Sequence, residues 1–281
     1  MRIVLILLTG LAVLAGCGGS DEGDAGGKLR VVATTEQLAD FARQVGSDRV
    51  QVETLLDRGT DPHDYEPRPS DAEAVARADV VLRSGGEVDE WLGDLVDAAG
   101  GDAKVVDVRE AIGETGDDPH WWQDPRNVLR ALPVIARELD GDPAPYARQV
   151  RALDRDVAAC MRSIPRERRK LVTNHDAFGY FARRYGIEVL GSILPGRSTS
   201  AQPSAKDTRE LVDAIERAGV ATIFPESALR QDLERAVARD AGAQVGEPLY
   251  ADTLGPSRTY VDALRHDAAA IAKGLGGSCR L

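Results

Sequence analysis

The chain has 281 residues, with 46 acidic side chains against 35 basic ones and a formal net charge of −11. An acidic surface repels phosphate backbones, so the composition argues against nucleic-acid binding and suits a cationic ligand.

The first residues have the pattern of a targeting segment. Arg2 is followed by an apolar run over 3–15, which has the length of a signal peptide and is too short to span a bilayer comfortably. The run ends in Leu14-Ala15-Gly16-Cys17, which is typical of a bacterial lipobox, although an ordinary secretory signal with an incidental cysteine is the alternative. We expect a signal peptide at 1–16 and a lipid on Cys17 that anchors an extracytoplasmic chain to the cell membrane.

A flexible tether is expected at 17–27, because residues 18–27 contain no apolar side chain larger than alanine and cannot bury a core. The remaining residues, 28–281, suffice for two small lobes or one large domain. In an oxidising compartment Cys160 and Cys279 can form a disulfide or remain separate thiols, and the sequence leaves both interpretations open.

Strands and helices alternate along the first part of the folded chain, which predicts a parallel sheet covered by helices. Expected strands cover 29–34, 50–56, 79–83 and 104–108, and expected helices cover 36–45, 70–78 and 88–99. Ser70 to Glu73 reads as a capping box that opens the second of these helices.

Two helical stretches without an intervening strand, at 125–139 and 143–163, interrupt the alternation. It then resumes with strands at 170–173, 187–193, 220–224 and 243–245 and helices at 176–185, 204–218, 228–239 and 257–273. We therefore predict two Rossmann-like α/β lobes joined by one long helix, with the first lobe at 28–139, the linking helix at 140–165 and the second lobe at 166–281.

Three of the four histidines lie in loops that follow predicted strands. These are His63, His120 and His175, whereas His266 falls in the last helix and is expected at the surface. Asp252 occupies the corresponding place after the last strand. Because ligands bind beyond the carboxyl ends of parallel strands, the four side chains are expected to converge in a cleft, where imidazole and carboxylate together suit zinc.

These residues also allow other interpretations. A single histidine in a loop is usually a solvated surface residue, but three in polar, Asp/Pro-rich loops are not readily accidental. The wide spacing of the candidate ligands matches no zinc finger, and the chain has no His-Glu-x-x-His motif of a zinc hydrolase. A surface adhesin has no sequence feature of its own here.

The loops resemble those of the zinc/manganese-binding subfamily of ABC-transporter solute-binding proteins over nearly the whole mature chain. The matching motifs lie at 61–71, 78–79, 118–125, 175–181, 185–186 and 252–255. The resemblance implies two α/β lobes joined by a long helix, and a metal bound between them by His63, His120, His175 and Asp252. It also implies a monomeric, non-enzymatic receptor that delivers metal to a membrane permease.

The metal is predicted from the third ligand. Manganese-binding members place a glutamate where His175 stands, and three nitrogens with one carboxylate favour zinc, with manganese or another divalent ion as the alternative. The short acidic stretch 113–117 lacks the histidine-rich loop of many zinc-binding members, so a metal-collecting role is not supported. Gln202, where the family usually has glutamate, is expected to have little effect on binding.

Three further residues lie where they could hold a ligand histidine in place. We expect Tyr65 and Glu66 to support His63. Glu226 follows a strand and either orients a ligand histidine or simply begins a helix, and both interpretations stay open.

Overall fold

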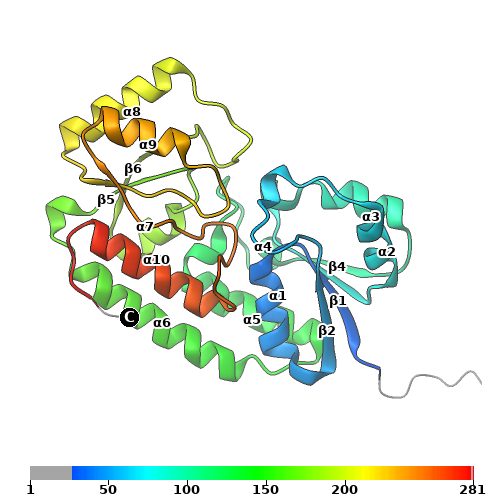
Figure 1. Ribbon diagram of the computed structural model, residues 1–281. Helices are drawn as coiled ribbons and strands as arrows, with labels where there is room; N and C mark the ends of the chain where they lie inside the picture. The colour runs from blue at the N-terminus through cyan, green and yellow to red at the C-terminus, as the bar shows by residue number, and fades with distance from the viewer. Residues whose placement is uncertain (1–26, 280) are drawn as a thin grey trace, which may run out of the picture.

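The computed structural model describes residues 27–279 and residue 281. The predicted signal peptide at 1–16, the lipid site at Cys17 and all of the tether except Gly27 lie outside the described residues. Within those residues, no helix combines the length and the apolar character that a membrane crossing requires. The chain folds into two α/β lobes with parallel sheets, and α6 (Ala144–Arg162) runs between them (Figure 1).

The first lobe is built on a four-stranded parallel sheet in the order β2-β1-β3-β4. Its strands are β1 (Leu29–Ala33), β2 (Val50–Thr54), β3 (Val80–Arg83) and β4 (Lys104–Asp107). The two central strands carry the valine-rich runs, as expected where helices cover both faces of a parallel sheet. All four predicted strands of this lobe are present.

Alternating residues of β1 pack against opposite helix layers. Val31 and Ala33 join the core formed with α1 and α5, whereas Val32 joins a second core formed with α2 and α3. The helices of this lobe are α1 (Glu36–Gly46), α2 (Pro69–Arg77), α3 (Leu92–Ala99), α4 (Val108–Ala111) and α5 (Pro125–Leu139). The short α4 was not predicted.

The capping box predicted at Ser70 is wrong. Helix α2 begins one residue earlier, at Pro69, because proline is well suited to the first helical position. The N–H of Arg68 donates to the Asp71 carboxylate at 2.6 Å, so Asp71 takes the capping role expected of Glu73.

The second lobe has shorter strands than predicted. They are β5 (Lys170–Thr173), β6 (Glu188–Ser192), β7 (Thr222–Ile223) and β8 (Gln244–Val245), paired in parallel as β5-β6 and β7-β8. A parallel bridge between Thr173 and Phe224 connects the two pairs. The helices are α7 (Gly179–Tyr185), α8 (Ala205–Ala218), α9 (Asp232–Asp240) and α10 (Tyr260–Gly274).

Several helices begin later than the hydrophobic pattern indicated. α7 begins at Gly179 rather than Asp176, because Asp176 and Ala177 form hydrogen bonds of the loop that carries His175. Ser204 caps α8, since Ser204 and Asp207 exchange side-chain to backbone hydrogen bonds at 3.0 and 3.1 Å.

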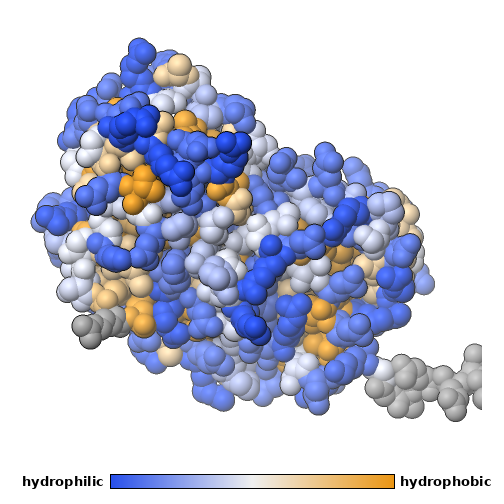
Figure 2. Space-filling model, viewed as in Figure 1, coloured by the Kyte–Doolittle hydropathy of each residue, from blue (hydrophilic) through white to orange (hydrophobic). Residues whose placement is uncertain are grey.

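Helices α5, α6 and α10 form a layer shared by both lobes (Figure 1). Helix α6 buries Tyr146, Val150, Leu153, Val157 and Met161, which recur at helical spacing along one face. The largest apolar core is continuous from β1 through these three helices to β5 and α7. On the face of the molecule shown in Figure 2, the surface is mainly hydrophilic and apolar residues occur as separate small patches.

Cys160 on α6 and Cys279 near the C-terminus lie together in a disulfide, with Cα atoms 5.1 Å apart. The arrangement attaches the end of the chain to the shared helix layer.

Candidate metal centre

His63 lies in a single 3₁₀ turn, η2 (Pro62–Asp64), between β2 and α2. The Asp61 carboxylate caps this turn by accepting the N–H of His63 at 2.9 Å. On the other side, Trp91 Nε1 donates to the carbonyl of Pro62 at 3.1 Å. Proline, the aspartate cap and the indole therefore fix the backbone from which the imidazole projects.

Of the two residues predicted to support His63, Tyr65 holds the loop in place and Glu66 does not. The Tyr65 hydroxyl donates to Asp71 Oδ2 at 2.6 Å and lies 3.0 Å from Leu55 O, which attaches the loop to the end of β2 and the start of α2. The Glu66 side chain is exposed, and among the residues described it has no hydrogen-bond partner. Its predicted support of His63 is wrong, since its side chain turns to solvent.

His120 immediately precedes the 3₁₀ turn η4 (Trp121–Gln123) and is fully buried. Asp118 holds it twice, because the carboxylate accepts the backbone N–H of His120 at 3.1 Å and lies 3.0 Å from the ring Nδ1. The tripeptide Asp-Pro-His thus produces the same backbone cap at 61–63 and at 118–120. Only Asp118 also reaches the imidazole.

His175 follows β5 in the second lobe and is also fully buried. Glu226 lies beside it, with Oε1 at 2.7 Å from His175 Nδ1 and 3.2 Å from its backbone nitrogen. Of the two interpretations left open for Glu226, the structure places the side chain where it orients a histidine. No helix begins there, since α9 starts at Asp232.

Asp252 lies in the segment between β8 and α10. Trp122 Nε1 and Gln123 Nε2 both donate to the carbonyl of Ala251, at 2.9 and 3.0 Å, so the segment is attached to the turn that follows His120. His266, the histidine expected at the surface, is half-buried instead. It stacks on Tyr250 with ring centroids 4.3 Å apart and lies 3.0 Å from Pro248 O, outside the ligand group.

The structure brings the four predicted ligands together. One donor atom of each residue lies within 4.8 Å of all the others. The Nε2 atom of His120 is 3.4 Å from that of His63 and 3.3 Å from that of His175. Asp252 oxygens lie 3.2 Å from His175 Nε2, 3.4 Å from His120 Nε2 and 3.7 Å from His63 Nε2. A tetrahedron of ligands about 2.0–2.1 Å from a central ion has edges of roughly 3.3–3.4 Å, so these spacings fit one small cation.

Hydrogen bonding fixes how the imidazoles can act. In their neutral forms His120 and His175 donate their Nδ1 protons to Asp118 and Glu226. Their Nε2 lone pairs then face a common point. Lone pairs so close together repel one another unless a proton or a metal cation lies between them, and a buried group of four such donors is typical of a coordination site.

The charges of the group perturb its titration. Burial lowers the pKa of His63 to about 4, while Asp252 opposes this effect and His120 and His175 add to it. Burial also disfavours the charged form of His175, but the carboxylates of Glu226 and Asp252 outweigh burial and raise its pKa well above the ordinary value. For Asp252, burial opposes ionisation, yet the neighbouring histidines hold its pKa below the usual range.

The donors are sealed from solvent. The histidine side chains are at most 1% exposed and that of Asp252 is 4% exposed, so an ion has no open path to them in this conformation. The segment 194–203 bridges two ligand loops. Its Thr199 hydroxyl donates to Asp61 Oδ2 at 2.6 Å, and Leu194 N donates to Asn174 O at 2.7 Å.

Sequence reasoning missed several residues that build the site. Asp118 could have been predicted from the sequence, because the repeated Asp-Pro-His pattern places an aspartate two residues before each of two candidate ligands. Trp91 and Thr199 carried no signal, since they reach the site from distant segments only after folding.

Comparisons with known proteins agree with this geometry. The zinc-binding protein TroA of Treponema pallidum is 34% identical over 285 residues, covering 92% of this chain and 92% of that protein. The manganese-binding lipoprotein MntA of Bacillus subtilis is 32% identical over 292 residues, covering 93% and 95% of the two chains. The solved structure of the periplasmic zinc-binding protein TroA matches with a TM-score of 0.82 at 31% identity, covering 89% of this chain and 99% of that one.

A sequence profile of the family described as zinc-uptake complex component A, periplasmic, matches residues 31–274, which is nearly the whole described chain. With the site geometry and two relatives above 30% identity, the match shows that this chain belongs to that family of metal-binding ABC-transporter substrate-binding proteins.

Proposed function

We propose that this protein is an extracytoplasmic receptor that captures Zn²⁺ between its lobes and delivers it to the permease of an ABC importer. The observation that carries the proposal is the buried group of His63, His120, His175 and Asp252, whose donor atoms lie at the spacing of one coordination sphere. The metal is the cargo of the protein, not a reagent.

Zinc is proposed over manganese because three of the four donors are imidazole nitrogens. Manganese prefers oxygen-rich sites, whereas zinc accepts mixed nitrogen and oxygen ligands in a four-coordinate arrangement. Relatives named for both metals are similar to this chain, so manganese is the second candidate.

A zinc hydrolase is a weaker proposal. Catalytic zinc sites usually keep one position for water beside three protein ligands. Here a fourth protein donor, Asp252, faces the same point, and the group is closed to solvent.

The remaining parts of the proposal concern cellular placement. We propose that the signal peptide at 1–16 is removed, that Cys17 carries the lipid, and that 17–27 tethers the folded part to the membrane. The lobes are proposed to span 28–139 and 166–281, with 140–165 between them. Cys160 and Cys279 are proposed to remain paired in the oxidising compartment, and the receptor is proposed to act as a monomer.

Calorimetry on metal-stripped protein tests the metal assignment. We expect one tightly bound zinc per chain, and we expect His120→Ala or His175→Ala to weaken binding by at least about a hundredfold, because each removes one ligand and leaves its carboxylate partner unpaired. Competition between zinc and manganese in the same experiment decides the preferred ion.

The matched control is Asp64→Ala. Asp64 is an exposed carboxylate next to His63 in the same turn, so its removal changes local charge without removing a donor. An unchanged zinc affinity in both histidine variants would refute the ligand assignment. A preference for manganese in the competition experiment would replace zinc by manganese in the proposal.

A further inference from the structure

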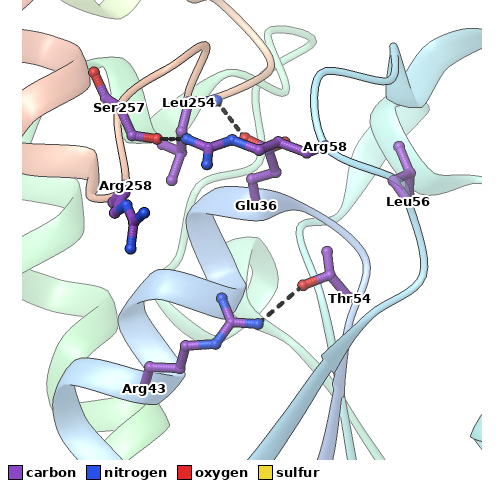
Figure 3. Close-up of a pocket in the computed structure, with 8 residues that line it drawn as sticks. All are labelled: Glu36, Arg43, Thr54, Leu56, Arg58, Leu254, Ser257 and Arg258. Carbon is purple, nitrogen blue, oxygen red and sulfur yellow. Dashed lines mark hydrogen bonds between the residues drawn. The ribbon is translucent and has the colours of Figure 1, made fainter.

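A group of hydrogen bonds beside the metal centre attaches the Asp252 segment to the first lobe. We call the side chains of Glu36 and Arg58 the clamp. Figure 3 shows both reaching toward the segment that carries Leu254 and Ser257. Glu36 lies in the first turn of α1, and Arg58 lies in the loop that leads from β2 to His63.

Glu36 connects two ligand loops through its two oxygens. Oε1 accepts the backbone N–H of Gly59 at 2.7 Å, and Oε2 accepts that of Leu254 at 2.7 Å. Gly59 belongs to the loop that leads to His63, and Leu254 follows closely after Asp252. One carboxylate thus fixes the distance between the backbones that carry these two donors.

Arg58 adds a second attachment. Its Nε and Nη2 lie 3.2 and 3.1 Å from the carbonyl of Gly255, and Nη2 also contacts that of Ser257. In addition, Gln37 Nε2 donates to Thr253 O at 3.4 Å. The backbone following Asp252 is therefore held by the first lobe.

Asp252 depends on such attachment more than the histidines do. His120 and His175 are oriented by Asp118 and Glu226, and the backbone of His63 is capped by Asp61. Asp252 has no comparable partner, since its Oδ1 receives no hydrogen bond from the described residues and its Oδ2 faces only histidine nitrogens. Its position is set by its backbone alone.

We infer that Glu36 and Arg58 are positioning residues that hold Asp252 against the three histidines and slow the escape of the bound metal. The inference rests on the proposed metal-receptor function and adds two residues that make no contact with the ion. A cavity of about 290 Å³ lies against the clamp, so water has access to these bonds.

The first test measures the rate at which zinc-loaded protein loses zinc to an excess of chelator. Glu36→Ala and Arg58→Ala are each expected to raise the dissociation rate about tenfold, the effect of losing one charge-assisted hydrogen bond. The matched control is Arg43→Ala. Arg43 lines the same cavity, but among the described residues its side chain bonds only Val52 O and Thr54 Oγ1 of its own lobe, at 3.3 and 3.4 Å, and its removal should leave the rate unchanged.

The second test is a double-mutant cycle with Asp252→Ala, which retains three histidines for weaker zinc binding. If the clamp acts through Asp252, Glu36→Ala causes no further loss of zinc affinity in that background. A residue with a merely structural role would cause the same loss in both backgrounds, and that result overturns the inference.

Different results would refute the metal-receptor function and the role of the clamp. A wild-type protein that binds no zinc refutes the receptor function itself. A wild-type protein that binds zinc, with Glu36→Ala and Arg58→Ala releasing it at the rate of Arg43→Ala, refutes only the clamp.

Discussion

At the scale of single residues, the centre is decided by the groups behind the ligands as much as by the ligands. Asp118 and Glu226 each occupy the Nδ1 side of one imidazole, so its Nε2 lone pair must face the interior of the group. Asp118 also caps its own loop through the backbone of His120, so one side chain sets both the backbone and the ring.

Glu226→Gln tests this orientation. The amide keeps an acceptor for His175 Nδ1 but loses the charge that strengthens the ligand, and we expect zinc affinity to fall about ten- to a hundredfold. Competitive titration with a zinc-binding dye provides the measurement, with Asp64→Asn as the control for loss of a nearby exposed carboxylate. A zinc affinity equal to that of the wild type would show that the charge of Glu226 does not contribute to metal binding.

Zinc affinity should fall as the pH is lowered, because metal and protons compete for the same nitrogens. The raised pKa of His175 favours a proton on this imidazole in the metal-free protein. Zinc must displace it, so the affinity drops about tenfold per unit of pH below that pKa. The decline steepens as His63, with a pKa of about 4, also becomes protonated. Titration calorimetry in buffers of different ionisation enthalpy measures the released protons, and an affinity independent of pH between 5 and 7 contradicts the prediction.

The candidate ligands could be predicted from the sequence because histidine and aspartate are residue types that bind metal. The clamp could not be predicted, because a glutamate and an arginine do not by themselves indicate a role at a metal site. Histidine in a polar loop after a strand is informative on its own. Glu36 reads as an ordinary acidic residue in the first turn of a helix, and Arg58 as a solvated loop residue. Their contacts with Leu254 and Gly255 exist only through tertiary folding.

At the scale of elements, the differences between expected and observed bounds fall beside the site. Hydrophobic spacing predicted helix at 228–231 and at 257–259, but α9 begins at Asp232 and α10 at Tyr260. The residues before these helices form local turns instead, as Leu229 N donates to Glu226 O at 3.4 Å and Ser257 N donates to Leu254 O at 3.0 Å. The hydrophobic spacing of a sequence shows which residues are apolar. It does not show where these helices begin, because the residues before them belong to the loops that carry the ligands.

The disulfide closes the C-terminal segment onto α6 across a sequence separation of 119 residues. Cys279→Ala is expected to lower the free energy of unfolding by about 2–4 kcal/mol, because the unfolded chain regains the freedom that the cross-link removed. Thermal unfolding measures the loss, and zinc affinity should remain that of the wild type because the bond lies outside the ligand group. A free-thiol assay that finds Cys160 and Cys279 reduced in secreted protein would refute the pairing.

At the scale of the whole molecule, the two lobes share a core. Apolar residues pack continuously from the sheet of the first lobe through α5, α6 and α10 to α7 in the second. A wide rotation of the lobes would open this core to water, at about 25 cal/mol for each Å² of apolar surface exposed.

We therefore expect metal exchange to proceed through rearrangement of loops, with little change in the placement of the lobes. Small-angle scattering of metal-free and zinc-loaded protein should give radii of gyration equal within experimental error. Hydrogen exchange should differ mainly at the ligand loops and at 194–203, where Thr199 contacts Asp61. A clear compaction on zinc binding would contradict the expectation.

The distribution of the four donors from position 63 to position 252 has a consequence for biogenesis. A chain that crosses a membrane unfolded presents isolated histidines, none with a second ligand nearby in sequence, and cannot carry zinc away from the compartment in which it was synthesised. The last donor takes its place only when Leu254 docks on Glu36, after almost all of the chain has emerged. Under the proposed export across the membrane, capture of the ion would be postponed until the folded molecule has reached the far side.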